Sequence, residues 1–553
     1  MRKLLFLLGT LICIGPALAQ QTNGTAAEPQ KRIVYFKDKA NSPYSLQQPL
    51  QFLSQKAIDR RTRQQIALTT RDLPVNPAYV AGLKQLEGVT VWYTSRWFNA
   101  AVVQCTDAKL AEIQALDFVK TSGSLNRIGT LPQAATVPVV EPLQQTAAVM
   151  DAPYSQAAYG QAFNQANMIG AVDLHNKGFT GQNMTIAVLD AGFPGVNTIP
   201  AFAHLFQNNK IKGTFDFVKK QENVYAEYSH GTSVLSTMAA YQPNQYIGTA
   251  FGANFILLRT EDVASEHKIE EINWLLAAEY ADSAGADVLN SSIGYTTFQA
   301  PSPSYTYNNL DGNTALVTKA ADYAAATGML VVVSAGNDGA REWRYIATPA
   351  DADSVLTVGS VDKDGIRAAS SSVGPTADGR IKPDVMAQGQ GAFVYGSAGN
   401  IAAGTGTSFS APIVAGLAAI LWEANSTKTS QEIIRMIRQS GSLAVNPTNE
   451  MGYGIPNASR IVTSLPQFVE NDLFITNPVS SQPVLLTLGE KWVKQESTVQ
   501  VYDITGRLIY QAVLPSQQYS HQLELQPQVL KQGVYFCRIS SGKHISTLRF
   551  LKL

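Results

Sequence analysis

The middle of the chain, residues 159–465, is constrained most strongly by short, continuous apolar runs that alternate with helical stretches. A strand that is apolar along its whole length buries both of its faces, which is typical of a parallel sheet covered by helices on each side. We therefore expect an α/β fold in this region, with a parallel sheet between two layers of helices. The apolar runs are residues 185–189, 255–258, 287–290 and 329–333, and the helical stretches are residues 268–283 and 313–326.

The regions on either side carry other patterns. Residues 32–127 mix β-rich runs with helical stretches, in an order that suits a small α+β unit of the split βαβ type. Residues 467–553 contain about seven short alternating segments separated by turns, which predicts a small β-sandwich. In the first region we expect strands at residues 33–36, twice within 89–103 and from 118, a helix at residues 49–66, and a helix to about residue 116 with Asp107 as its N-cap.

The N-terminus has the pattern of a secretory signal peptide. Arg2 and Lys3 precede an apolar run at residues 4–14, and Pro-Ala-Leu-Ala closes the segment with small residues. The run is too short to span a membrane. We expect cleavage after Ala19 and export of the protein. The expected division is residues 1–19 signal peptide, 20–128 α+β domain, 129–156 linker rich in Pro, Ala, Gln and Val, 157–465 α/β domain and 467–553 β-sandwich.

Charge and cysteine content exclude some classes of protein. The 42 basic and 42 acidic residues of the 553-residue chain cancel, so the basic excess of a nucleic-acid-binding protein is missing. Three cysteines cannot build a disulfide scaffold. The balance hides two oppositely charged regions: residues 20–128 carry 14 basic and 8 acidic side chains, and residues 157–465 carry 18 and 26. Such charges favour docking of the two regions, and a chance asymmetry of surface charge is the alternative.

Side chains of complementary chemistry stand in settings that suit a hydrolytic site. Asp190 ends the apolar run 185–189, at the carboxyl end of a predicted parallel strand, where open α/β sheets bind ligands. Ser408 begins a helical stretch whose free N–H groups suit a developing oxyanion, and a serine nucleophile needs an adjacent base such as His230. Asn337 follows another predicted strand among glycines, where its amide can serve as a second oxyanion donor.

The order Asp190, His230, Ser408, with an Ala-Gly-Asn segment between the last two, resembles the subtilisin-like serine proteases. The resemblance covers about residues 157–465. Asp190 is followed by Ala-Gly, whereas Ser or Thr commonly follows the aspartate in that family, but the carboxylate is kept. The matching motifs are residues 230–232 (His-Gly-Thr), 372–375 (Ser-Val-Gly-Pro), 382–385 (Lys-Pro-Asp-Val) and 406–412 (Gly-Thr-Ser-Phe-Ser-Ala-Pro).

This resemblance implies a secreted serine endopeptidase with a Ser-His-Asp triad, in which Asn337 and the Ser408 N–H hold the oxyanion. It also implies that residues 287–294 form an exposed strand that pairs with an extended peptide substrate. No cofactor is implied. The implied substrate-binding residues are Ser292, Ile293, Gly294 and Gly336, the last of which lines the pocket for the side chain before the scissile bond.

The flanking regions also resemble parts of known proteases. Residues 32–128 are similar to the family's N-terminal propeptides in position and strand order, which implies a folding aid and intramolecular inhibitor; a permanent accessory domain is the alternative. Residues 60–63 (Arg-Arg-Thr-Arg) look like a convertase site, but their helical context favours a solvated helix face. Residues 467–553 resemble the C-terminal sorting domains of the type IX secretion system in Bacteroidetes, through residues 476–480, 501–507, 533–536 and 548–553.

That last resemblance implies interaction with the type IX machinery and a secreted or cell-surface location, although a β-sandwich also suits binding of carbohydrate or of a protein partner. A catalytically inactive, peptide-binding member of the family is the alternative to an enzyme. A metalloprotease is discounted because no His-Glu-x-x-His motif occurs. We expect no metal site, because the clustered acids lack the spacing of a calcium loop; these are Asp351, Asp353, Asp362 and Asp364.

Overall fold

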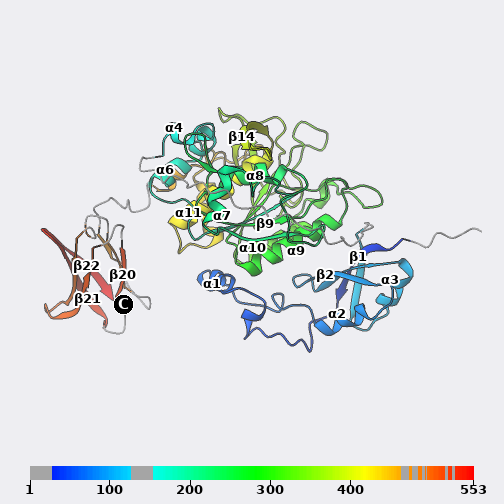
Figure 1. Cartoon of the computed structure of the whole chain (residues 1–553), viewed down its shortest axis with the longest axis horizontal. Coiled ribbons are helices and arrows are strands. Elements are labelled where there is room, and N and C mark those ends of the chain that lie inside the picture. Colours follow the sequence, from blue (N-terminus) through cyan, green and yellow to red (C-terminus); the bar gives the residue numbers. More distant parts are fainter. Residues whose placement is uncertain are drawn as a thin grey trace, which may run out of the picture. The chain divides into compact units, whose positions relative to one another are not determined.

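The computed structural model describes residues 28–125 and 154–462 and, in the C-terminal part, residues 473–475, 484–488, 492, 495–516, 521–525 and 530–552. The predicted signal peptide and nearly all of the predicted linker, residues 129–156, lie outside the described residues. The chain divides into two compact units, one that ends at Ser459 and one that begins at Arg460 (Figure 1).

A seven-stranded parallel sheet forms the centre of the first unit, which confirms the expected α/β fold. Its order is β13-β12-β11-β10-β5-β9-β6, and every neighbouring pair is parallel. The four apolar runs form β5, β9, β10 and β11. The sequence pattern did not predict β6, which is a partly exposed edge strand, β12, whose apolar run is interrupted by Gly and Ser, or β13. The bounds are β5 Thr185–Asp190, β6 Ile211–Asp216, β9 Asn254–Arg259, β10 Val288–Ser291, β11 Leu330–Ser334, β12 Leu356–Val361 and β13 Val385–Gln388.

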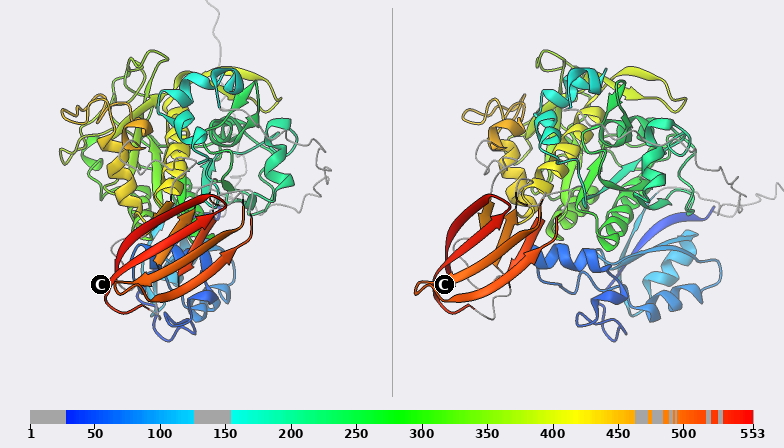
Figure 2. Two further views of the ribbon diagram at one scale, coloured as in Figure 1. Left: turned by 90° about the vertical axis from the view of Figure 1, so that its left-hand side faces the viewer. Right: turned by 60° about the vertical axis from the view of Figure 1, so that its left-hand side comes forward.

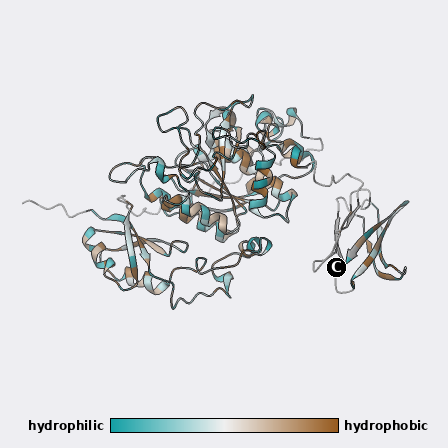
Figure 3. Ribbon diagram, turned by 180° about the vertical axis from the view of Figure 1, so that it is seen from behind, coloured by the Kyte–Doolittle hydropathy of each residue, from teal (hydrophilic) through white to brown (hydrophobic). Residues whose placement is uncertain are grey.

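Helices cover both faces of this sheet. The helices α9 (Ile269–Ala284) and α10 (Leu316–Ala326), both predicted, share a hydrophobic core with one face. The helices α8 (His230–Ala239) and α11 (Thr407–Ala424) pack on the other. By length and composition α11 could cross a membrane, but 83% of its apolar window is buried in this unit, as in a core helix. Figure 3 shows apolar residues, in brown, on the strands between the helices.

Shorter elements complete the first unit around the sheet. Two antiparallel hairpins, β7-β8 and β14-β15, lie outside the parallel sheet. The bounds are α4 Gln156–Tyr159, α5 Phe163–Asn167, α6 Ala171–Asn176, η2 Pro200–Phe202, α7 Ala203–Gln207, β7 Tyr241–Gln242, β8 Tyr246–Ile247, η3 Tyr307–Asn309, β14 Gln390–Tyr395, β15 Ile401–Thr405, α12 Ser430–Gln439 and α13 Ala458–Val462.

The N-terminal part of this unit is a four-stranded antiparallel sheet in the order β2-β3-β1-β4, the arrangement expected of a split βαβ unit. The sequence analysis missed α2, although Asn76 as N-cap followed by proline is a helix-start signal. The predicted N-cap Asp107 is wrong by one residue, since the Thr106 hydroxyl accepts from the Lys109 N–H. The bounds are β1 Gln30–Phe36, η1 Pro49–Gln51, α1 Gln55–Arg63, α2 Pro77–Lys84, β2 Thr90–Ser95, β3 Ala100–Cys105, α3 Asp107–Gln114 and β4 Val119–Ser124.

Of the helix expected at residues 49–66, only Gln55–Arg63 form α1 and Pro49–Gln51 form the separate η1. The interpretation of its arginines as a solvated face is wrong. Arg60 and Arg61 are only 1% and 2% exposed, and both pair with the Asp282 carboxylate of α9. A sequence window cannot reveal such a partner, because Asp282 lies more than 200 residues away along the chain.

The second unit is the expected β-sandwich (Figure 2). Two antiparallel sheets, β16-β17-β20 and β19-β18-β21-β22, contribute to one hydrophobic core that includes Leu486, Val499 and Phe550. Cys537 is buried in this unit and Cys105 in the other, both as free thiols. The bounds are β16 Leu473–Ile475, β17 Val484–Leu488, β18 Ser497–Asp503, β19 Leu508–Leu514, β20 His521–Leu525, β21 Gly533–Ser541 and β22 His544–Lys552.

Candidate active site

Asp190 and His230 meet at the carboxyl end of β5. Asp190 is the last residue of that strand and is fully buried, and His230 is the first residue of α8. The imidazole Nδ1 lies 2.8 Å from Asp190 Oδ1 and 3.1 Å from Oδ2. A carboxylate accepts hydrogen bonds, so Nδ1 carries the proton and Nε2 presents its lone pair. Among the described residues Nε2 has no hydrogen-bond partner, which leaves it open to take a proton.

Gly192 and Gly231 allow the backbone segments that carry Asp190 and His230 to approach each other closely. A Cβ atom on Gly231 would lie 2.4 Å from the Gly192 carbonyl oxygen and 2.9 Å from Asp190 Cβ. Gly192 has a φ of +147°, and a Cβ there would lie 2.6 Å from the Ala226 carbonyl oxygen. Only glycine therefore lets the start of α8 approach the end of β5 closely enough for the hydrogen bond.

Burial and the Asp190 carboxylate act in opposite directions on His230. Burial of the ring disfavours its charged form, but the charge of Asp190 and its hydrogen bond outweigh burial and raise the pKa of His230 above its usual 6.5. The imidazole is thus a stronger base than a free histidine. Its side chain keeps 28% of its surface exposed, so a substrate can reach it.

Ser408 stands in the first turn of α11. Its hydroxyl donates to the Ser292 carbonyl oxygen at 3.4 Å, and the Ser292 hydroxyl donates back to the Ser408 carbonyl at 2.8 Å. The next ring along α11, Phe409, has its centroid 6.0 Å from that of His230. These contacts bring Ser408 to the same edge of the sheet as His230, although no hydrogen bond joins the two in the described structure. Such bonds are often long or poorly aligned before substrate binds.

Two N–H donors face a common space beside Ser408. The Asn337 amide oxygen accepts from the Thr407 N–H at 2.9 Å and from the Thr407 hydroxyl at 3.1 Å, which turns Nδ2 outward. The Ser408 N–H, in the first turn of α11, has no acceptor among the described residues. A Cβ atom on Gly406 would lie 3.6 Å from Asn337 Nδ2 and 3.8 Å from Ser408 N. The absence of a side chain at position 406 keeps this space open.

The predicted substrate-binding residues lie around this edge, with one correction. The strand expected at residues 287–294 ends at Ser291 and is buried, because β10 lies between β5 and β11 in the middle of the sheet. Only beyond it does the chain come to the surface, with Ser292 still buried, Ile293 half-buried and Gly294 exposed. In the described structure no hydrogen bond engages the backbone of Ile293 or Gly294, so both can pair with a peptide. The Gly336 N–H lies 3.2 Å from the Thr407 hydroxyl.

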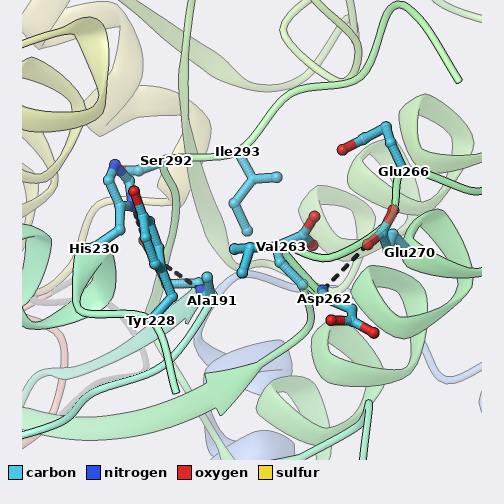
Figure 4. Close-up of a pocket in the computed structure, with 11 residues that line it drawn as sticks. Ala191, Tyr228, His230, Asp262, Val263, Glu266, Glu270, Ser292 and Ile293 are labelled. Atoms are coloured by element: carbon cyan, nitrogen blue, oxygen red, sulfur yellow. Dashed lines mark hydrogen bonds and ion pairs between the residues drawn. The ribbon is translucent and has the colours of Figure 1, made fainter. Parts of the chain in front are cut away.

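A pocket of about 180 Å³ opens beside His230. Figure 4 shows His230 and Tyr228 on one side, Glu266 and Glu270 on the other, and Val263 and Ile293 between them. The sequence analysis missed its acidic lining. The signal available was the density of acids in residues 261–271, directly after β9, whose carboxyl end shares an edge with that of β5. The acids that line the pocket are Asp190, Glu261, Asp262, Glu266 and Glu270.

Burial changes the ionisation of two of these acids. It raises the pKa of Glu261 to about 8, against the hydrogen bonds donated by the Tyr295 and Thr260 hydroxyls. It also raises the pKa of Glu266 to about 7, with a contribution from the charge of Glu271. Both carboxyl groups therefore keep protons at a pH where exposed glutamates are ionised.

Replacing Glu261 with glutamine should make the first unit more stable at high pH. The folded state holds a proton on Glu261 up to about pH 8, while the unfolded state loses it near pH 4.5, so this group destabilises the fold increasingly as pH rises between the two values. We expect the difference in unfolding free energy between E261Q and its parent to grow by about 3 kcal/mol from pH 5 to pH 8. Urea unfolding of a Ser408→Ala chain measures it. The exposed control Glu450→Gln should show no such trend, and a flat difference for E261Q would contradict the expectation.

The four clustered acids, at which the sequence analysis expected no metal site, bind groups of the protein itself. Asp351 is buried and accepts from the Thr318 hydroxyl at 2.6 Å, Asp353 pairs with Arg380, and Asp364 pairs with Lys363. Asp362 accepts from the Asp364 and Ile366 N–H groups. Within the described ranges, no group of three or more His, Cys, Asp or Glu side chains is arranged to hold a metal ion.

Comparison with known proteins matches three regions of the chain. Residues 31–136 match the Peptidase S8 propeptide domain of Bacteroidota, residues 181–454 match the Subtilase family, and residues 477–552 match the Secretion system C-terminal sorting domain. A solved structure, MycP1 with its N-terminal propeptide removed, aligns at a TM-score of 0.44 and 23% identity, over 55% of this chain and 98% of that one.

Similar curated proteins are subtilisins. Subtilisin NAT of Bacillus subtilis subsp. natto is 32% identical over 270 residues, which are 48% of this chain and 62% of that protein, so less than two thirds of its length is covered. Subtilisin of Bacillus pumilus is 32% identical over 48% of this chain and 86% of its own length. Subtilisin Savinase of Lederbergia lenta is 30% identical over 51% and 92%. With the sheet, its helices and the Asp190–His230 contact, these matches show that the chain belongs to the subtilase family, with a Bacteroidota-type propeptide domain and a C-terminal secretion sorting domain.

Proposed function

We propose that this protein is a secreted serine endopeptidase that cleaves peptide bonds with Ser408, His230 and Asp190. The observation that carries the proposal is the hydrogen bond from His230 Nδ1 to the buried Asp190 carboxylate, which directs an open, basic Nε2 to the surface. Family membership supports the reaction class, since the relatives are subtilisins.

The proposed reaction has two stages. Ser408 Oγ attacks the peptide carbonyl carbon while His230 Nε2 takes the hydroxyl proton, and the same proton then goes to the leaving amine. A water molecule hydrolyses the resulting ester by the same route. Asp190 keeps the imidazole in the required tautomer and stabilises its charged form. The tetrahedral oxygen would accept from Asn337 Nδ2 and the Ser408 N–H, both of which are without acceptors in the described structure.

Peptide binding is proposed to use the chain beyond β10. The free backbone groups of Ile293 and Gly294 would pair with an extended substrate, and Ser292 would position Ser408 through their two hydrogen bonds. Gly336 would line the pocket for the side chain before the scissile bond.

The flanking domains suggest how the enzyme is inhibited before it is processed and how it is exported. We propose residues 28–125 as an intramolecular inhibitor and folding aid, because they match a propeptide domain. We propose that the C-terminal unit directs the protein through the type IX machinery to the outside of the cell, where it is released or stays attached, because it matches a sorting domain.

One observation favours a second candidate, a peptide-binding subtilase without activity: the Ser408 hydroxyl bonds to Ser292 and not to His230. A fluorophosphonate separates the two candidates, because it reacts only with an activated serine. We expect labelling of the peptide that contains Ser408 in the processed protein and none in Ser408→Ala. Absence of labelling in both would support the binding protein.

The role of Asn337 can be measured separately. Replacing it with leucine removes one oxyanion donor, and we expect kcat to fall by about 10²–10³-fold with little change in KM, the scale known for such a donor in the relative subtilisin. Asn337→Asp is the matched variant, because it keeps the oxygen that accepts from Thr407 while placing negative charge against the oxyanion. We expect it to lose at least as much activity. Near-normal kcat in both variants would exclude Asn337 from the site.

A further inference from the structure

The segment that connects β1 to α2 forms ion pairs and hydrogen bonds with the α/β domain, in addition to joining the two elements. Residues 41–72, here called the arm, carry α1 and project from the four-stranded sheet to the α/β domain of the same unit. The rest of the N-terminal segment, residues 28–40 and 73–125, is called the body. The body contacts α9 at Glu279, whose carboxylate accepts from the Arg96 and Trp97 N–H groups at 2.9 and 3.1 Å. The arm makes further contacts, one of them at the end of the same helix.

A buried ion cluster joins arm and body to the end of α9. The Asp282 carboxylate is fully buried and pairs with Arg60 and Arg61 of the arm and with Arg96 of the body. Arg61 also pairs with Asp72 at 2.8 Å. An acid in the last turn of a helix is disfavoured by the helix dipole, so Asp282 depends on these cations. Removing one partner of a buried ion pair is strongly destabilising, because the other charge is left buried and unpaired.

The arm also covers the amino ends of three neighbouring strands. Lys56 Nζ donates to the Thr185 hydroxyl at 2.6 Å, at the start of β5, and pairs with Asp287, just before β10, at 2.8 Å. Gln64 donates to the Gly328 carbonyl, just before β11, at 2.7 Å and accepts from the Ser430 N–H at 2.8 Å. The strands β11, β10 and β5 are adjacent in the sheet. The helix α1 and the residue that caps its C-terminus therefore contact the amino end of each strand.

The opposite ends of the same strands carry the candidate catalytic residues. Asp190 ends β5, Ser292 follows β10 and Asn337 follows β11. No hydrogen bond or ion pair of residues 28–125 reaches any of the eight candidate site residues in the part of the chain that is described. The contacts of the arm therefore lie at the opposite end of these strands from the candidate active site.

We propose that the arm is a second docking site of the N-terminal segment, which binds the amino edge of the central sheet through the Asp282 arginine cluster. After the chain is cut, this contact sets the rate at which the N-terminal segment dissociates from the α/β domain. The contact requires a basic helix, because its cations and amide donors bind Asp282, Asp287, the Thr185 hydroxyl and the Gly328 carbonyl. Because the ion pairs at Asp282 are buried, salt screens them little.

The test uses the full chain with Ser408→Ala, so its outcome does not depend on catalytic activity. A recognition sequence for an unrelated protease is inserted within residues 126–153, the chain is cut, and dissociation of the N-terminal piece is followed by size-exclusion chromatography and by exchange with a labelled copy. We expect the piece to stay bound at 0.5 M NaCl, and Arg60→Met to speed its dissociation by at least about 30-fold.

Two further variants make the result decisive. Lys56→Ala removes a half-exposed ion pair between the arm and Asp287, and we expect this variant to fold. We expect its N-terminal piece to dissociate about 5-fold faster than that of the wild type. Lys109→Ala is the control, because among the described residues Lys109 forms its ion pair with Glu112 on the same helix of the body and with no other residue. Thermal melts of the uncut chains show whether Arg60→Met still folds; if it does not, Lys56→Ala decides. Release of the wild-type piece on cutting, or arm variants that match Lys109→Ala, would overturn the proposal.

Discussion

Replacing Ser408 with alanine is expected to lower kcat on casein by about 10⁶-fold, the scale measured for loss of the nucleophile in the relative subtilisin. The variant keeps the imidazole and the oxyanion donors but has no oxygen that can form the ester. KM should change little, since the peptide-binding backbone at Ile293 and Gly294 is untouched. The measurement compares casein turnover by the processed wild type and by the variant purified in the same way.

A serine two residues further along the same helix provides the matched control. The Ser410 hydroxyl is buried and has no hydrogen-bond partner among the described residues, so Ser410→Ala removes the same group without removing a hydrogen bond. We expect its kcat to stay within about 3-fold of wild type, because the change lies away from the reacting atoms. Equal turnover by Ser408→Ala and wild type would refute the proposed nucleophile.

Replacing Asp190 with asparagine is expected to lower kcat by about 10⁴-fold. An amide in place of the carboxylate can donate to Nδ1 of His230, which forces the proton onto Nε2, and Nε2 can then no longer accept one from Ser408. The protein should still fold, because the amide fills the same buried volume and can still accept the Ala191 N–H that now binds Asp190 Oδ1 at 2.8 Å.

The same variant should move the pH profile. The base works only when neutral, so activity falls as pH drops through the pKa of His230, which Asp190 raises above 6.5. Without the carboxylate, burial alone acts and lowers the pKa, so the acid limb of kcat/KM shifts to lower pH. Asp338→Asn, which removes a surface carboxylate paired with Arg341, should leave the limb in place. A limb that does not move in Asp190→Asn would mean that His230 is not the group titrating.

Local sequence patterns predicted much of the fold, because the spacing of apolar residues indicates which faces of a strand or helix are buried. The runs at residues 185–189 and 329–333 are apolar along their whole length, and a strand of this kind can only lie inside a sheet covered on both faces. Alternating segments predicted the C-terminal sandwich for the same reason. The pattern failed where burial is incomplete, as in β6, and where Gly and Ser interrupt the apolar run of a fully buried strand, as in β12.

By itself, the sequence determined the α/β core, the three kinds of domain and the identities and order of Asp190, His230, Asn337 and Ser408, because each of these is written in a short stretch of chain. Only the tertiary structure decided what those stretches meet. In that structure Arg60 and Arg61 are buried and pair with Asp282, and β10 ends before Ser292. Glu261 and Glu266 lie in the pocket beside His230. Contacts of this kind join residues far apart in the chain, and packing and desolvation, which no local pattern encodes, decide which of them form.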